Sequence, residues 1–155
     1  MNTQRISDIV AVWDVRVSGP IEEILPEALS RFSSERGDDF VLKEVGGIDD
    51  SLLNRLEFEA EVIRHVDASG LPVAVPLRDG RGRIAVPWEG HYYRLSPCLP
   101  SADDEVTGLA RDLLFHNYGK TIAQMHLALA AFPHDKLEGR VGRTVLESEV
   151  FDIGL

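Results

Sequence analysis

The sequence has a single cysteine and no long hydrophobic run, and each of these features excludes certain classes of protein. Cys98 stands alone in 155 residues, which excludes an internal disulfide and is typical of a reducing compartment. No apolar run approaches the roughly 20 residues that cross a bilayer. Residues 1–8 lack the apolar segment of a secretory signal. We therefore expect a cytoplasmic protein that has no membrane partner.

Basic charge is also scarce. The chain has 16 Lys plus Arg against 26 Asp plus Glu, a formal net charge of -10. Non-specific nucleic-acid binding needs cations that displace counterions from phosphates, so we expect no nucleic-acid partner. A small anionic ligand remains compatible with an acidic chain, because a few local cations and backbone N–H groups suffice to hold phosphate.

Hydrophobic periodicity predicts an α+β fold. Apolar residues in the segment 5–15 predict a short leading helix, and three strands joined by short turns follow over residues 14–45. The spacing then predicts a helix over 51–66, started by Asp49, Asp50 or Ser51, and a return to strands over 72–100. A long helical stretch over 101–132 completes the pattern. Short turns between the first strands indicate an antiparallel sheet.

The third predicted strand carries a charge on an apolar face. Lys43 shares its strand face with Val41 and Val45, because side chains alternate along a strand. A single strand lysine most often covers apolar surface with its stem and keeps its ammonium in water. That interpretation stays open beside a second one, in which the following helix supplies a partner.

Glu59 is the candidate for that partner, because of its position on the predicted helix. The predicted helix has Leu52, Leu56, Ile63 and Val66 on one face, and Glu59 completes the stripe. A buried, unpaired carboxylate is costly, so Glu59 should be exposed, protonated or paired with a cation. The simplest arrangement is an ion pair between Lys43 and Glu59. Kinases use a strand lysine and a helix glutamate in this way to hold the phosphates of ATP.

Five segments, taken in order, resemble one family. They are "RISDIVAVWDV", "DVRVSGPIEEILPEALSRFSSERGDDFVLKEV", "FEAEVIRHVDASGLPVAVPLRDGRG", "HYYRLSPCLPS" and "YGKTIAQMHLALAAF". Together they are similar to the N-terminal part of the aminoglycoside phosphotransferase and homoserine kinase-like family, small-molecule kinases with a protein-kinase-like fold. The resemblance implies a nucleotide-binding N-lobe over residues 1–100, with a five-stranded antiparallel sheet and one packed helix. Residues 101–155 would then hold a linker after the hinge and the first long helices of an incomplete, helical C-lobe.

The resemblance also implies a set of site residues. Lys43 would contact the nucleotide phosphates, and Glu59 would be its ion-pair partner. Ser30, in the connection 26–30, would stand where the family has its phosphate-covering loop, although an ordinary hairpin turn is an equal alternative there. At the hinge, the Ser96 carbonyl and the Cys98 N–H would meet the adenine edge. The implied cofactor is ATP, with Mg²⁺ in complete family members.

The catalytic residues of the family are not found in this sequence. Its chemistry needs a loop of the form H-x-D-x-x-x-x-N and a further metal-binding aspartate. Asparagine occurs only at positions 2, 54 and 117, all before the region where that loop is expected. We therefore predict no catalytic and no metal-binding residue. The expectation is an ATP-binding lobe of a phosphotransferase that is catalytically incomplete, and enzymatic activity of the chain is left open.

Two other interpretations remain. The chain could be a non-catalytic interaction module on the same scaffold, in which a second chain or copy covers the apolar face of the helix at 105–131. It could also be an unrelated α+β domain in which Lys43 and Glu59 coincide by chance. Replacement of Lys43 by alanine should abolish nucleotide binding under the kinase-like hypothesis and leave association unchanged under the interaction hypothesis.

Overall fold

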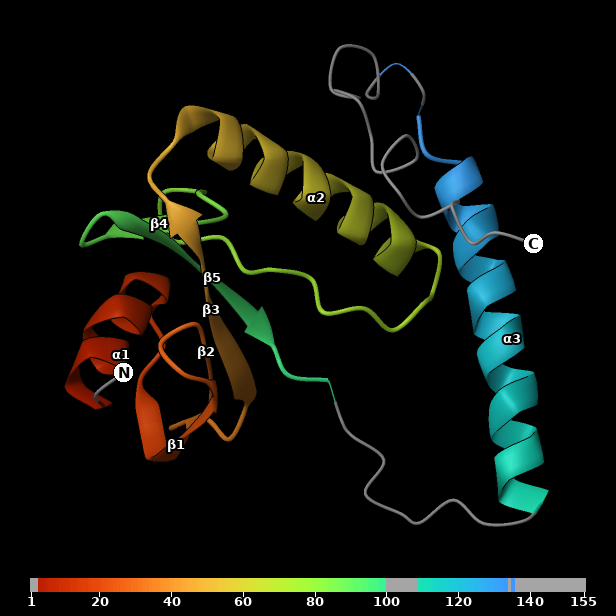
Figure 1. The fold of residues 1–155 in the computed structure, drawn as a ribbon, viewed down its shortest axis with the longest axis horizontal. Coiled ribbons are helices and arrows are strands. Elements are labelled where there is room, and N and C mark those ends of the chain that lie inside the picture. The colour runs from red at the N-terminus through yellow and green to blue at the C-terminus, as the bar shows by residue number, and fades with distance from the viewer. Residues whose placement is uncertain (1–2, 100–108, 134, 136–155) are drawn as a thin grey trace, which may run out of the picture.

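The structure is a computed structural model that describes residues 3–99, 109–133 and 135 (Figure 1). Its elements are α1 (Thr3–Val10), the 3-10 helix η1 (Ala11–Trp13), β1 (Val17–Leu25), β2 (Leu29–Ser34), β3 (Asp39–Gly47), α2 (Asp50–Ala68), β4 (Val86–Trp88), β5 (His91–Pro97) and α3 (Leu109–Ala130). Of the predicted second part, 101–155, only α3 and the few residues after it fall within this description.

The five strands form one sheet in the order β1-β2-β3-β5-β4, and all neighbours are antiparallel. The predicted five-stranded antiparallel sheet is thereby confirmed. The β4–β5 hairpin turns through Glu89 and Gly90, whose φ angles are 46° and 84°. Two-residue hairpin turns favour positive φ at both positions, which glycine adopts without strain and glutamate does not.

The sheet is covered on both faces, by α1 on one and α2 on the other (Figure 1). Alternation along β3 sends Phe40 and Leu42 to the α1 side, and Val45 to the α2 side. The core on the α1 side contains Ile6, Ile9, Val10, Trp13, Phe32, Phe40, Leu42, Val86, Tyr93 and Leu95. A smaller core on the α2 side contains Leu56, Ala60, Ile84, Ala85 and Tyr92. Lys43 therefore belongs to the face that α2 covers.

Helix α2 begins where the sequence predicts. The Asp49 side chain accepts a hydrogen bond from the Ser51 N–H at 3.1 Å, which satisfies a backbone donor that the helix leaves unpaired. The buried line of α2 runs through Leu56, Ala60 and Val66. Glu59 lies at the edge of this line with 45% of its side chain exposed, rather than in its centre as the predicted stripe has it.

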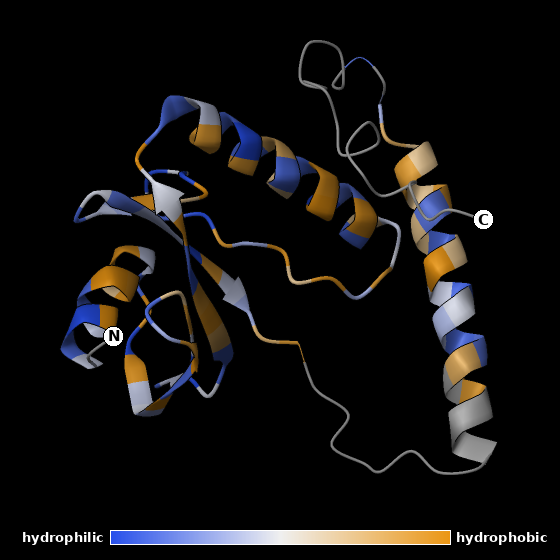
Figure 2. Cartoon of the chain, viewed as in Figure 1, coloured by the Kyte–Doolittle hydropathy of each residue, from blue (hydrophilic) through white to orange (hydrophobic). Residues whose placement is uncertain are grey.

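Helix α3 contacts the rest of the molecule through its C-terminal end. Ala128 is buried with Val66 and Leu71, and its carbonyl oxygen lies 2.8 Å from the Nε2 atom of His65. Phe132, just beyond α3, meets the His65 ring edge to face. Hydrophobic residues recur along α3 (Figure 2), and several of them have exposed side chains. In the described part of the chain, no helix has the length and apolar character needed to span a membrane.

Candidate functional site

A cavity of about 360 Å³ lies on the α2 side of the sheet, between β3 and the segment that follows β5. Its size falls in the range of small-molecule sites, roughly 300–1,000 Å³. The residues that line it are Leu29, Val41, Lys43, Ala74, Arg94, Ser96, Pro97, Cys98 and Leu99. The structure thus brings together three of the five predicted site residues: Lys43, Ser96 and Cys98.

Strand register explains why these side chains meet. Lys43 lies opposite Leu29 on β2 and opposite Arg94 on β5. Val41 lies opposite Ser96 in the same way. Directly opposed residues of antiparallel strands project from the same face of the sheet. One wall of the cavity is therefore a patch of three strands, with two cations at its centre and apolar side chains beside them.

The carboxylate of Glu59 is bonded to Arg94, not to Lys43. The Nη1 atom of Arg94 lies 3.1 Å from the Oε2 atom of Glu59, and Arg94 has 15% of its side chain exposed. Within the described ranges, no carboxylate oxygen lies in ion-pair distance of the Lys43 ammonium. The predicted Lys43–Glu59 pair is thus replaced by an Arg94–Glu59 pair, because the guanidinium beside Lys43 reaches the carboxylate from α2.

Arg94 is the site residue that the sequence analysis missed. It stands between Tyr93 and Leu95, both buried. The only sequence signal for Arg94 is the same one that singled out Lys43: a cation on an alternating, largely apolar strand. Whether such a cation lies beside Lys43 depends on which residues are opposite each other in β3 and β5, and the sequence alone does not give that register.

The hinge has a different orientation from the predicted one. The Cys98 N–H donates to the Asp39 carbonyl oxygen of β3 at 2.8 Å. It is therefore not available to donate to a ligand. The Leu95 carbonyl accepts from the Leu77 N–H at 2.8 Å on the opposite edge of β5. Because backbone groups alternate between the two edges of a strand, the Pro97 carbonyl points away from β3, as the Leu95 carbonyl does.

The Asp39 side chain ties the same residue to β2. Its carboxylate accepts from the Ser33 hydroxyl at 2.6 Å and from Arg31 at 3.2 Å. These two hydrogen bonds, that of Ser33 first, hold the pKa of the Asp39 carboxyl below its ordinary value. The first residue of β3 is therefore tied to β2 by its side chain and to the hinge by its carbonyl.

Ser30 lies away from the cavity. It is paired with Leu42, whose side chain is in the core on the α1 side, and it is fully buried there. Its hydroxyl has no hydrogen-bond partner among the described residues. The prediction that Ser30 contacts phosphate placed it in a loop, whereas β2 begins at Leu29 and turns the Ser30 side chain to the opposite face.

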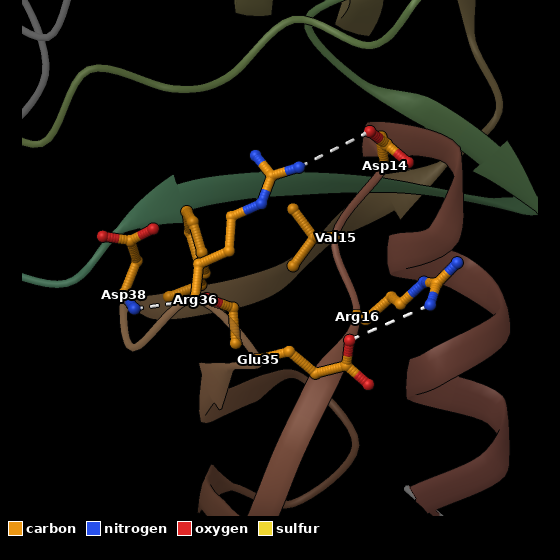
Figure 3. Close-up of a pocket in the computed structure, with 8 residues that line it drawn as sticks. Asp14, Val15, Arg16, Glu35, Arg36 and Asp38 are labelled. Atoms are coloured by element: carbon orange, nitrogen blue, oxygen red, sulfur yellow. Dashed lines mark hydrogen bonds and ion pairs between the residues drawn. The ribbon is translucent and has the colours of Figure 1, made fainter.

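A second cavity, of about 400 Å³, lies at the η1–β1 connection and the β2–β3 turn (Figure 3). Two arginines at its rim already have carboxylate partners: Arg36 lies 4.0 Å from Asp14, and Arg16 lies 3.9 Å from Glu35. All four side chains are largely exposed, so these pairs are weak and solvent-screened. None of the predicted site residues lines this cavity.

Metal-ligating side chains do not gather in the described part of the molecule. No group of three or more His, Cys, Asp or Glu residues there is arranged to hold an ion. The cavity beside Lys43 has two cations and no acidic side chain in its lining. These residues fit an anionic ligand and do not fit a protein-bound Mg²⁺.

Comparison with known proteins finds no matching family model and no matching curated protein. Solved structures do match. An aminoglycoside phosphotransferase from Alicyclobacillus acidocaldarius is similar with a TM-score of 0.61 and 16% identity, over 87% of this chain and 37% of that one. A spectinomycin phosphotransferase in complex with ADP and spectinomycin gives 0.61 and 14%, over 88% and 40%. An amicoumacin kinase in complex with AMP-PNP and Ca²⁺ gives 0.60 and 19%, over 86% and 41%.

At these identities the likeness shows the fold. The chain has the α+β fold of the matched part of these kinases, and it spans about 40% of their length. The kinase-like fold class predicted from the sequence is confirmed, and so is the partial extent of the match.

Proposed function

We propose that the chain is the nucleotide-binding N-terminal part of an ATP-dependent small-molecule phosphotransferase, with residues 1–100 as the nucleotide lobe and residues 101–155 as the start of a helical lobe. The observation that carries the proposal is the cavity that joins Lys43 on β3 to the hinge after β5. Nucleotides bound in the ADP and AMP-PNP complexes of the similar kinases support it by analogy of fold.

Adenine would lie against the hinge. Its N6 amino group needs an acceptor and its N1 needs a donor. The Pro97 carbonyl is directed away from β3 and can accept, and an extended backbone continued past the end of β5 would direct the Leu99 N–H to that edge as a donor. Leu29 and Val41 in the cavity lining supply apolar surface for the flat faces of the ring. Ser96 lies at the inner end of this space.

The phosphates would lie near Lys43. Its ammonium is exposed and has no carboxylate partner among the described residues, so its charge is available to the α- and β-phosphates. Phosphoryl transfer depends on positioning and on neutralisation of charge, and Mg²⁺ supplies part of that neutralisation when it is bound. In this proposal the chain holds the donor nucleotide, and no group of three or more His, Cys, Asp or Glu among the described residues is arranged to hold the metal.

Calorimetric titration with ATP and ADP, with and without Mg²⁺, tests the proposal. The wild type should bind both nucleotides, and Lys43→Ala should weaken binding at least about tenfold, as the loss of a charge-assisted hydrogen bond does. Lys120→Ala, which removes an exposed lysine of α3, is the matched control and should bind as the wild type does. Equal affinities for Lys43→Ala and the wild type would contradict the assignment of Lys43.

A second candidate function is a protein-interaction module, which the apolar surface of α3 favours. Leu113, Phe115, Tyr118 and Leu127 are each more than 60% exposed. Apolar surface of this kind is buried by association when a partner chain or a second copy is available. Sedimentation velocity tests this function directly. Self-association that Leu127→Glu abolishes and Lys43→Ala leaves unchanged would favour the interaction module; a monomer at all concentrations would contradict a second copy as the partner.

A further inference from the structure

The face of the sheet below α2 carries more positive than negative charge at the cavity. Lys43 and Arg94 lie directly opposite each other on β3 and β5, and both line the cavity. Like charges in directly opposed positions destabilise a sheet unless an anion lies near them. Glu59 provides one negative charge for the two cations.

Arg94 is the cation better suited to hold that carboxylate. Its side chain is 15% exposed, so it has less water to solvate its charge than the exposed Lys43 has. A guanidinium also binds a carboxylate in a more defined geometry than an ammonium does. Another acidic side chain of α2, Glu57, is bonded to Arg78 at 2.7 Å and is not available to either cation.

We propose that Arg94 is a positioning residue of the nucleotide site: it keeps Glu59 away from Lys43, so that Lys43 meets the phosphates with its charge uncompensated. This inference rests on the proposed function, since it assumes that Lys43 contacts phosphate. It differs from the arrangement implied by the family resemblance, in which Glu59 holds Lys43 itself. In this chain Arg94 binds the helix glutamate, and the strand lysine is left without a carboxylate partner among the described residues.

The proposal predicts the outcome of a double-mutant cycle. In Arg94→Gln, Glu59 loses its partner, and Lys43 is the neighbouring cation left to receive it. Lys43 is then compensated, and the ratio of ATP affinity to adenosine affinity should fall about five- to tenfold. In Glu59→Gln the ratio should stay at the wild-type value or rise. In the double variant Arg94→Gln/Glu59→Gln no carboxylate competes for Lys43, so the ratio should return to the wild-type value.

The ATP-to-adenosine ratio separates this role from structural ones. Arg94→Lys keeps a cation beside Glu59 and should retain the wild-type ratio. If Arg94 contacted phosphate directly, the double variant would remain as weak as Arg94→Gln, and the proposal would be overturned. A decrease of the ratio in Glu59→Gln would overturn it too, because Glu59 would then be needed by Lys43. Parallel losses of ATP and adenosine affinity in both single variants would reveal a purely structural ion pair.

A measurement without nucleotide tests one part of the inference separately from the proposed function: that Arg94 keeps Glu59 away from Lys43. The rate at which acetic anhydride acetylates Lys43, relative to Lys120 in the same molecule, reports how firmly the Lys43 ammonium is held by a carboxylate. Arg94→Gln should slow the acetylation of Lys43 several-fold relative to that of Lys120, and the double variant should restore the wild-type rate. An unchanged rate in Arg94→Gln overturns the inference. Failure of the wild type to bind ATP overturns the proposed function and with it the positioning role of Arg94, but the acetylation rates would still test whether Arg94 keeps Glu59 from Lys43.

Discussion

The backbone N–H of Cys98 donates to the carbonyl oxygen of Asp39 at 2.8 Å, and this bond directs the backbone N–H of Cys98 to the sheet. It joins the segment after β5 to the first residue of β3. With Cys98 directed to the sheet, the residues on either side of it are directed to the opposite edge. In the proposed complex, the edge that would hydrogen-bond adenine therefore belongs to Pro97 and Leu99, while the Cys98 side chain only lines the space.

Leu99→Pro should weaken adenosine and ATP binding to the same degree, by about fivefold to tenfold, because proline removes the N–H proposed to donate to the ring. Calorimetry with both ligands measures this. Cys98→Ala is the control, since it keeps every backbone donor and should change affinity by less than about twofold. A large loss in Cys98→Ala together with full binding in Leu99→Pro would reverse the hinge assignment.

Asp79 should make the protein sensitive to acid. Its buried carboxylate accepts hydrogen bonds from the N–H groups of Arg81 and Arg83 and from the Arg83 guanidinium. Burial acts to raise the pKa of Asp79, but the Arg83 backbone and side-chain bonds outweigh it, and the pKa is lowered. A lowered folded-state pKa gives stability that is present above the unfolded-state pKa and is lost as the pH falls through the folded one.

Asp79→Asn should therefore destabilise the protein by about 1–3 kcal/mol at neutral pH. Urea denaturation between pH 7 and pH 3 should show the difference from wild type narrowing as the acid end is approached. A constant difference over that range would mean that the charge of Asp79 does not contribute.

The Tyr93 hydroxyl should ionise at a higher pH than an ordinary tyrosine does. Burial first, and then its hydrogen bond to Glu44 at 2.7 Å, raise the pKa of Tyr93 from 10.0 to about 12. A raised folded-state pKa means that the stabilisation is complete below pH 10 and is lost between pH 10 and about 12. The absorbance of phenolate, recorded as the difference between wild type and Tyr93→Phe, measures this ionisation. A midpoint near the ordinary value would show that the Tyr93–Glu44 contact does not persist in solution.

The start of α2 should respond to its capping residue. Asp49→Ala removes the acceptor of the Ser51 N–H and should lower the free energy of unfolding by about 1 kcal/mol. Asp49→Asn keeps an acceptor of the same reach and should be close to wild type. Urea denaturation of the two variants compares them; equal losses would indicate that the carboxylate charge, rather than the cap, is what stabilises the helix.

Local sequence patterns were sufficient to predict the elements that carry the site. The alternating residues around Lys43 predict β3, and the Asp49–Ser51 cap with a following apolar stripe predicts α2. Both signals act over a few residues and do not depend on the partner element. The mixture of helices and antiparallel strands followed from these elements and from their order along the chain, and the kinase-like fold class followed from the family resemblance.

Pairing between distant residues could not be predicted in the same way. Ser30 faces the α1 side because β2 begins at Leu29, after a turn in which Glu27 has a φ of 60°. A shift of one residue sends a side chain to the other face of a sheet. The same reasoning applies to Glu59. It is bonded to Arg94 and not to Lys43 because of the register of β3 and β5, which no local pattern encodes.

The central claim is that a nucleotide occupies the cavity between Lys43 and the hinge, and amide chemical-shift mapping with AMP-PNP tests it most directly. A nucleotide in this cavity should produce the largest shifts at Val41, Lys43 and Leu99, with little change around the second cavity at Arg16 and Arg36. Saturating AMP-PNP that shifts only the second cavity, or leaves every amide of the β3–hinge region unmoved, would contradict it.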